Sequence, residues 1–99
     1  MTVVPNDENF VRRKVNRKRQ HCVYIVQCRY GTYYTGYTND LAARIALHTK
    51  GQGAKYLRGR LPVTLVYTKK YKSSQDALRA ERNIKNLTRQ EKEILVKGQ

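Results

Sequence analysis

Five side chains that could carry acid–base and phosphate chemistry stand inside the most regular segments of this 99-residue sequence. Tyr24 and Tyr34 lie in two successive strand-like segments, and Arg44 and His48 follow on a helix-like segment. Glu81 falls on the inward side of a later helix-like segment. Phenols, an imidazole and a carboxylate can move protons or bind a metal ion, and an arginine can neutralise a phosphate. The set therefore suggests chemistry on a phosphodiester.

Three strands are expected to position these groups. Residues 22–28 form a nearly unbroken apolar run rich in β-branched and aromatic residues, which predicts a central strand. A short turn containing Gly31 leads to a second strand over 32–37, so the two strands make a hairpin. Pro62 then opens a third strand over 63–68. Three strands cannot cover themselves, so helices must pack on the sheet.

Capping patterns predict three helices. Thr38 or Asn39 is expected to cap the first helix, which runs from Asp40 to about Lys50 and is ended by Gly51. Ser73 with Asp76 forms the capping pattern of the second helix, which runs to about Leu87. Thr88 with Glu91 forms that of the third helix, which runs to about Val96. A basic loop over 51–61 follows the first helix. The order strand–strand–helix–strand–helix–helix predicts an α+β fold with a small, three-stranded, mainly antiparallel sheet flanked by helices.

The first helix presents two polar groups beside its apolar face. At about 100° per residue, Leu41, Ala42 and Ile45 form the inward stripe. Arg44 and His48 are four apart and lie one above the other at the edge of this stripe, where they can project over the open end of the sheet. An ordinary solvated helix face, with the arginine in an ion pair, is the alternative.

The second helix carries a carboxylate close to the core. Its inward stripe comprises Ala77, Ala80, Ile84 and Leu87. Glu81 lies on or beside this stripe, where a charge is costly unless it is paired or bound to a metal. A salt bridge to Arg44 and a divalent-ion site are both open. A single glutamate does not imply a metal by itself.

Gly36 leaves space in its strand for the side chains of the two tyrosines. Glycine within a strand lets another group approach closely, so the phenols of Tyr24 and Tyr34 can meet near Arg44 if they share its side of the sheet. A phenol has a reference pKa of about 10 and is a poor base. It becomes usable only where positive charge favours the phenolate.

Two short motifs resemble those of the GIY-YIG nuclease superfamily. The motifs are Cys22-Val23-Tyr24 and Tyr34-Thr35-Gly36, with Arg44 ten residues after Tyr34. The stretches Gly51-Gln52-Gly53-Ala54-Lys55-Tyr56 and Arg60-Leu61-Pro62-Val63 look like the small stand-alone, single-domain branch of that superfamily. The resemblance runs from about His21 to Leu95.

The resemblance implies a role for each of the five side chains. Tyr34 resembles the general base that activates water, with Tyr24 positioning it. Arg44 matches the arginine that stabilises the scissile phosphate, and His48 falls where a histidine or tyrosine assists proton transfer. Glu81 matches the ligand of a single Mg²⁺ or Mn²⁺ ion.

The sequence departs from the family pattern at three points. Cys22 replaces the first glycine, and Tyr37 follows Gly36 where several members carry lysine. Asn83 and Asn86 are both candidates for a late asparagine. These departures leave the fold expectation intact. They support one alternative, a catalytically weak or inactive nucleic-acid-binding module of the same fold.

The charge of the chain predicts a polyanionic partner. Its net charge is +14, from 21 lysines and arginines against 7 acidic residues, and such a field attracts nucleic acid. Tyrosines interleaved with the cations can stack on bases. The expected DNA-contacting residues are Arg12, Arg13, Lys14, Arg17, Lys18, Arg19, Tyr37, Lys55, Arg58 and Arg60. An anionic membrane surface is the second candidate by charge.

The chain is expected to hold one domain over 21–97 behind a basic, flexible tail over 1–20. No apolar run approaches the ~20 residues of a membrane span, and the first residues lack the apolar stretch of a secretory signal. We expect an intracellular protein with no membrane partner. Cys22 and Cys28 are expected to be buried free thiols, because a disulfide cannot close along one strand at their separation.

Together these expectations describe a metal-dependent DNA endonuclease. With no added domain to read sequence, it would select branched, nicked or single-stranded DNA in repair or recombination, or be targeted by another protein. A rival from a different class is an interaction domain whose basic tail docks on an acidic protein.

Overall fold

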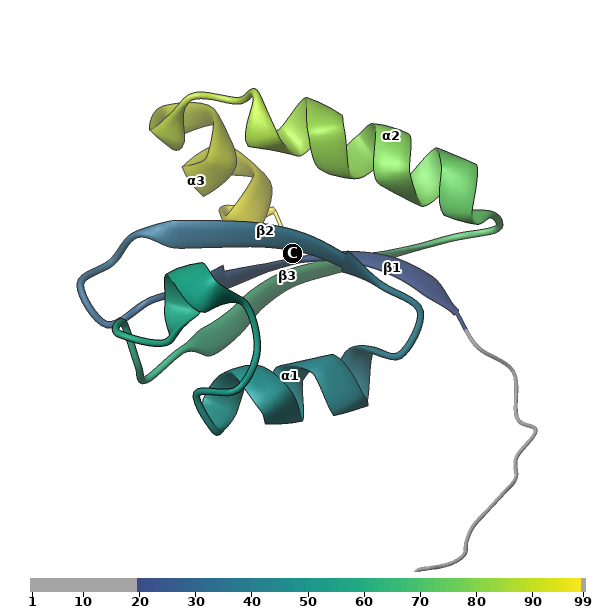
Figure 1. The fold of residues 1–99 in the computed structure, drawn as a ribbon. Coiled ribbons are helices and arrows are strands. Elements are labelled where there is room, and N and C mark those ends of the chain that lie inside the picture. Colours follow the sequence, from purple (N-terminus) through teal and green to yellow (C-terminus); the bar gives the residue numbers. More distant parts are fainter. Residues whose placement is uncertain (1–19, 99) are drawn as a thin grey trace, which may run out of the picture.

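A computed structural model describes residues 20–98 and shows a three-stranded sheet with helices on both faces (Figure 1). The strands are β1 (His21–Gln27), β2 (Tyr33–Thr38) and β3 (Thr64–Tyr71). The helices are α1 (Leu41–Thr49), the short 3₁₀ helix η1 (Lys55–Leu57), α2 (Ser74–Lys85) and α3 (Arg89–Lys97). The predicted α+β fold and element order are confirmed, with η1 inside the stretch expected to be a loop. The basic cluster of the predicted tail lies outside the described residues.

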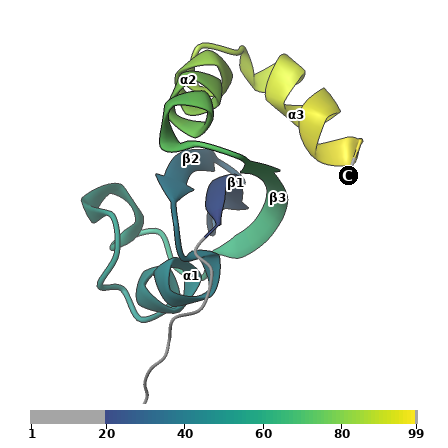
Figure 2. The ribbon, with the colours of Figure 1, turned by 90° about the vertical axis from the view of Figure 1, so that its right-hand side faces the viewer.

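The sheet is antiparallel, in the order β2-β1-β3, so β1 is central and β2 is an edge strand. Helices α2 and α3 cover one face, and α1 covers the other (Figure 2). No helix among residues 20–98 is long and apolar enough to cross a membrane.

β1 is buried on both faces, as its apolar run predicted. Val23 and Ile25 pack in a core beneath α2 and α3 with Tyr67, Ala77 and Ile84. Tyr24, Val26 and Cys28 face the other way, into a core that Leu57 of η1 completes. Both cysteines are buried free thiols, as expected. Tyr24 thus places a phenol inside the core on the α1 face.

The caps of the last two helices are as predicted. The Ser73 hydroxyl accepts the N–H of Asp76 at 3.1 Å and begins α2. Thr88 and Glu91 form a full capping box at the start of α3. Each cap satisfies backbone N–H groups that have no partner within the helix.

The predicted cap of α1 was wrong. The residue that caps this helix is Asp40, whose carboxylate accepts the N–H of Ala43 at 3.2 Å. Thr38 is instead the last residue of β2, and its buried hydroxyl hydrogen-bonds the backbone of Asp40. The helix ends at Thr49, and Gly51 follows with φ of 76°, a left-handed conformation that favours glycine.

The predicted inward face of α1 needs a second correction. Ala42 is exposed, whereas Leu41, Ile45 and His48 face the sheet, with His48 only 1% exposed. These three residues are spaced i, i+4 and i+7, which is one face of a helix. His48 therefore belongs to the core stripe itself, whereas Arg44, an exposed residue one turn earlier, lies at the edge of this stripe.

Candidate active site

Gly36 leaves room for the phenol of Tyr24. The two residues are paired partners on β2 and β1. A Cβ atom built on Gly36 would collide with the Tyr24 hydroxyl and ring. Because β2 has no side chain at this point, the buried phenol of the central strand can lie against the edge strand.

Tyr24 and His48 form a buried hydrogen bond. Tyr24 Oη and His48 Nε2 are 2.8 Å apart, and both side chains are almost fully buried. On the other side of the imidazole, the backbone N–H of Ala54 donates to His48 Nδ1 at 3.3 Å. A backbone N–H can only donate, so Nδ1 is the unprotonated nitrogen of the neutral ring. The ring proton therefore sits on Nε2 and points at the Tyr24 oxygen.

The environment keeps both partners neutral at physiological pH. Burial raises the pKa of Tyr24 to about 12, the neighbouring Tyr34 adds to the rise, and the charge of Arg44 counters part of it. Burial, and then the positive charge of Arg44, lower the pKa of His48. Since the Tyr24 oxygen accepts the His48 proton, its own hydrogen is free to be donated to another group.

Tyr34 is the more accessible phenol of the pair. It is partly exposed, whereas Tyr24 is 0% exposed. Its ring meets the His48 ring edge-on, with centroids 5.8 Å apart, and lies 6.5 Å from the Tyr24 ring. The structure therefore brings Tyr24, Tyr34 and His48 into one aromatic cluster on the α1 face. Only Tyr34 combines membership of this cluster with contact to solvent.

Arg44 and Glu81 approach this cluster from opposite faces of the sheet. Arg44 is exposed on α1, and its charge acts on both Tyr24 and His48. Glu81 is on α2, and its charge is also felt at Tyr24. Its salt bridge runs to Lys85 at 3.3 Å, rather than to Arg44, the partner considered from the sequence.

The donor set around Glu81 suits an ion that the protein binds through a single carboxylate. Residues 20–98 contain no group of three or more histidine, cysteine or acidic side chains that could hold an ion. Mg²⁺ is commonly bound by one or two carboxylates together with substrate phosphates and waters. The Glu81 side chain is 18% exposed and forms a salt bridge with Lys85. The chain thus offers one carboxylate for an ion whose coordination the substrate completes.

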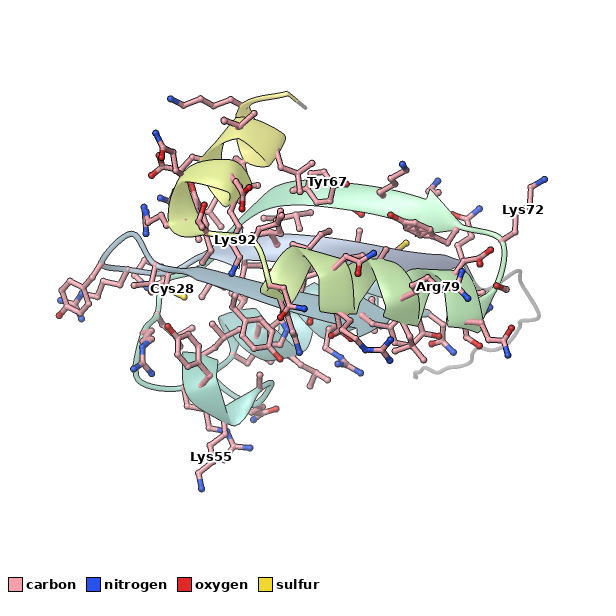
Figure 3. All side chains as sticks on the ribbon, turned by 90° about the horizontal axis from the view of Figure 1, so that it is seen from above. Cys28, Lys55, Tyr67, Lys72, Arg79 and Lys92 are labelled. Carbon is pink, nitrogen blue, oxygen red and sulfur yellow. The ribbon has the colours of Figure 1, made fainter. Side chains whose placement is uncertain are left out.

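The predicted DNA-contacting residues are divided between two faces. Lys55, Arg58 and Arg60 are exposed in and after η1, and Lys55 points outward from the molecule (Figure 3). Tyr37 packs against the opposite core, and its hydroxyl hydrogen-bonds His21 Nδ1 at 2.9 Å. Tyr37 is therefore not brought together with Lys55, Arg58 and Arg60. The predicted contacts Arg12, Arg13, Lys14, Arg17, Lys18 and Arg19 lie outside the described residues.

The two candidate asparagines lie elsewhere. Asn83 lines a cavity between β3, α2 and α3, together with Tyr67 and Leu95. Asn86 caps the end of α2 with its backbone.

Sequence reasoning missed the contribution of residues 53–56. A Cβ atom on Gly53 would collide with the imidazole of His48, so this glycine lies directly against the ring. Tyr56 stacks on Tyr34, with centroids 5.8 Å apart and planes 22° from parallel. The sequence signal was the run Gly53-Ala54-Lys55-Tyr56, part of the family resemblance, in which only Lys55 was given a role.

Comparison with known proteins identifies the family. Residues 20–94 match the family model described as the GIY-YIG catalytic domain, so the chain belongs to the GIY-YIG family of nuclease domains. One similar protein is a UPF0213 protein of Halobacterium salinarum. It is 53% identical over 75 residues, which are 76% of this chain and 97% of that protein. A UPF0213 protein of Staphylococcus aureus is 51% identical over 77 residues, or 78% and 94% of the two chains.

Two solved structures share the fold. The solution structure of a UPF0213 protein from Bacillus halodurans matches with a TM-score of 0.53 at 49% identity, over 79% of this chain and 83% of that one. A protein from E. faecalis matches with a TM-score of 0.58 at 37% identity, over 85% and 90% of the two chains. The predicted GIY-YIG-like α+β fold is confirmed.

Proposed function

We propose that this protein is a divalent-metal-dependent endonuclease that hydrolyses DNA phosphodiester bonds. The observation that carries the proposal is the cluster of Tyr24, Tyr34 and His48 beside Arg44, with the carboxylate of Glu81 close enough to act on the same phenol. A phosphate bound here would meet a cation, a carboxylate and an accessible phenol at once. The family to which the chain belongs supports the same chemistry.

Each residue has a distinct part in the proposed reaction. Tyr34, the accessible phenol, loses its proton to solvent and, as the phenolate, takes a proton from the attacking water. Tyr24 stays protonated, since its pKa is about 12, and its hydroxyl donates a hydrogen bond to the reacting groups without losing the proton. His48 assists proton transfer by holding Tyr24 through Nε2–H.

Charge that develops on the phosphate is balanced from two sides. Arg44 neutralises the non-bridging oxygens in the transition state. Glu81 is the residue that would hold a Mg²⁺ or Mn²⁺ ion, which when bound polarises the phosphate and stabilises the leaving oxygen. Metal binding would break the Glu81–Lys85 salt bridge, which costs on the order of 1 kcal/mol because the Lys85 side chain is half-exposed and Glu81 is partly exposed.

We further propose that the substrate is branched, nicked or single-stranded DNA and that the protein acts inside the cell in repair or recombination. The exposed cations Lys55, Arg58 and Arg60 suit binding to the DNA backbone rather than to a defined sequence. The basic cluster within residues 1–20 would add phosphate contacts. Target choice would then depend on DNA shape or on a protein partner.

A cleavage panel tests the proposal. Duplex, nicked, single-stranded, flap and junction DNA would each be incubated with the protein in Mg²⁺, in Mn²⁺ and in EDTA. Cleavage of at least one substrate that EDTA abolishes is the expected result. No cleavage of any substrate, with DNA binding retained, would leave the second candidate, a nucleic-acid-binding module without turnover. That candidate is favoured by one observation, the pairing of Glu81 with Lys85.

A further inference from the structure

Tyr34 is held by a column of two further side chains. Tyr56 of η1 stacks on the Tyr34 ring with centroids 5.8 Å apart. The guanidinium carbon of Arg60 lies 4.0 Å from the centroid of the Tyr56 ring, which is a close cation–π contact. We refer to these three side chains as the Arg60–Tyr56–Tyr34 stack. It joins an exposed cation to the accessible phenol of the site.

The stack is tied to the backbone. Arg60 Nη1 donates to the Tyr56 carbonyl oxygen at 2.6 Å, so the guanidinium is fixed to the residue it covers. The Arg60 carbonyl accepts the N–H of Arg29 at 2.9 Å, which ties the end of the loop to the turn between β1 and β2. Leu57, the last residue of η1, is 1% exposed in the core beneath the site. An exposed arginine held at both its main chain and its side chain has lost most of its freedom.

The same loop also holds the other side of the aromatic cluster. Ala54 donates its N–H to His48 Nδ1, and Gly53 lies against the imidazole. Residues 53–60 therefore contact both the buried histidine and the accessible tyrosine. A segment with two such contacts can fix the geometry of the site without touching the substrate.

We propose that Tyr56, clamped by Arg60, is a positioning residue that sets the orientation of the Tyr34 phenol. The inference deepens the proposed function, because it rests on Tyr34 as the base. The rings of Tyr24 and His48 also lie beside the Tyr34 ring, but without the stacked Tyr56 ring this partly exposed side chain would be free to shift away from them. Misplacement of a reacting group by about 1 Å can cost about 10²-fold in rate. The stacked ring removes that freedom.

The face of the Tyr56 ring is the feature required, not its hydroxyl. Tyr56→Phe keeps the ring and should cleave at a rate within about twofold of the wild type. Tyr56→Leu keeps apolar volume but loses the π face, and should lower the single-turnover rate at saturating DNA by about 10- to 100-fold. The dissociation constant for DNA should stay within about twofold. A loss of rate without a loss of affinity, rescued by phenylalanine, separates positioning from general packing.

Arg60→Lys tests the other end of the stack. Lysine keeps the charge but lacks the planar guanidinium that covers the ring and bonds the Tyr56 carbonyl. Positioning predicts a lower rate at unchanged affinity and unchanged salt dependence of binding. If Arg60→Lys or Tyr56→Leu weakens binding and leaves the saturated rate unchanged, the two residues are DNA contacts only and the proposal is overturned.

A spectroscopic readout keeps the inference independent of activity. Aromatic ring NMR signals of Tyr34 should shift, and its ring flips should become faster, in Tyr56→Leu and in Arg60→Lys but not in Tyr56→Phe. If the wild type cleaves no DNA, the proposed function fails while these signals still test the stack. Unchanged Tyr34 signals in folded Tyr56→Leu would overturn the positioning role. If that variant does not fold, the Arg60→Lys signals decide in the same way.

Tyr30 supplies the matched control. It is 77% exposed in the turn between β1 and β2 and has its own arginine partner, with Arg29 5.3 Å from the ring centroid. Tyr30→Leu removes an exposed ring from an arginine–tyrosine pair that does not reach Tyr34. It should leave the cleavage rate and the Tyr34 signals unchanged. A similar fall in rate in this variant would show that loss of any such ring is sufficient, and would overturn the proposal.

Discussion

The Tyr24 hydroxyl and the His48 imidazole share a buried hydrogen bond of 2.8 Å, in which the donor is the histidine Nε2–H. This direction follows from the Ala54 N–H, which occupies Nδ1. In the resting site, His48 therefore cannot accept a proton at Nε2. It is a neutral donor that fixes Tyr24, and the accessible Tyr34 is left as the better candidate for the base.

The neutrality of His48 predicts that stability falls in mild acid. The folded pKa is lowered by burial and by Arg44, whereas the unfolded chain protonates this residue near pH 6.5. The contribution of neutral His48 to the free energy of unfolding is therefore fully present above about pH 6.5. It is lost as the pH falls from there through the lower pKa of the folded state. Urea unfolding from pH 8 to pH 5 should show this decline. His48→Gln should be less stable at pH 8 and should lose that part of the pH dependence.

Gly36→Ala should destabilise the protein. The added methyl would collide with the phenol of Tyr24, and overpacking of a filled site costs about 1–3 kcal/mol. Gly59→Ala is a suitable control, since a Cβ there has no heavy atom within 4 Å. The difference between the two variants in urea unfolding measures the collision. Equal stability of both would show that the strand yields to the phenol at little cost.

Tyr34→Phe should keep the fold and DNA binding while losing about 10²–10⁴-fold in single-turnover rate. The ring and its stacking on Tyr56 remain, and only the oxygen is lost. Tyr24→Phe should cost less rate, because Tyr24 orients its neighbour. A fast Tyr34→Phe enzyme beside an inactive His48→Ala would move the base role to His48.

Glu81→Gln should fold, bind DNA and not cleave it. Glutamine keeps the shape of the side chain but loses the charge that holds a divalent ion. Glu93→Gln is the control, since Glu93 makes an i,i+4 salt bridge with Arg89 on α3, as Glu81 does with Lys85 on α2. Wild-type cleavage by Glu81→Gln would show that the metal assignment is wrong. Its failure to fold would mark Glu81 as a structural ion-pair partner.

Deletion of residues 1–20 should weaken DNA binding and flatten its salt dependence. Each phosphate contact releases counterions, so the slope of log K against log salt counts the contacts made. The rate of cleavage at saturating DNA should stay near that of the full chain. An unchanged slope would show that the basic cluster does not touch the DNA backbone.

The fold was largely predictable because its signals are local. The apolar run of β1, the glycine after α1 and the Thr88–Glu91 capping box act over a few residues, so each can be found without tertiary contacts. The cap of α1 was misplaced because three polar residues in a row can each serve. Asp40 is the cap in the structure, because Thr38 is the last residue of β2 and pairs with Cys22 of β1.

The site was less predictable because its decisive contacts are tertiary. His48 has the spacing of a core residue after Leu41 and Ile45, but a histidine gives no apolar signal. Its burial depends on Tyr24 and Ala54, which supply partners for both ring nitrogens. The stacking of Tyr56 on Tyr34 joins segments 22 residues apart in the chain, and no periodicity records such a pair.

The edge strand β2 runs between the two helices that supply the site. Arg44 and His48 come from α1 on one face of the sheet, and Glu81 comes from α2 on the other (Figure 1). The candidate site is therefore assembled only when both helices are packed on the sheet. We therefore expect the proposed activity to require the packing of α1 and of α2 at once, so that its loss would report damage to either face of the sheet.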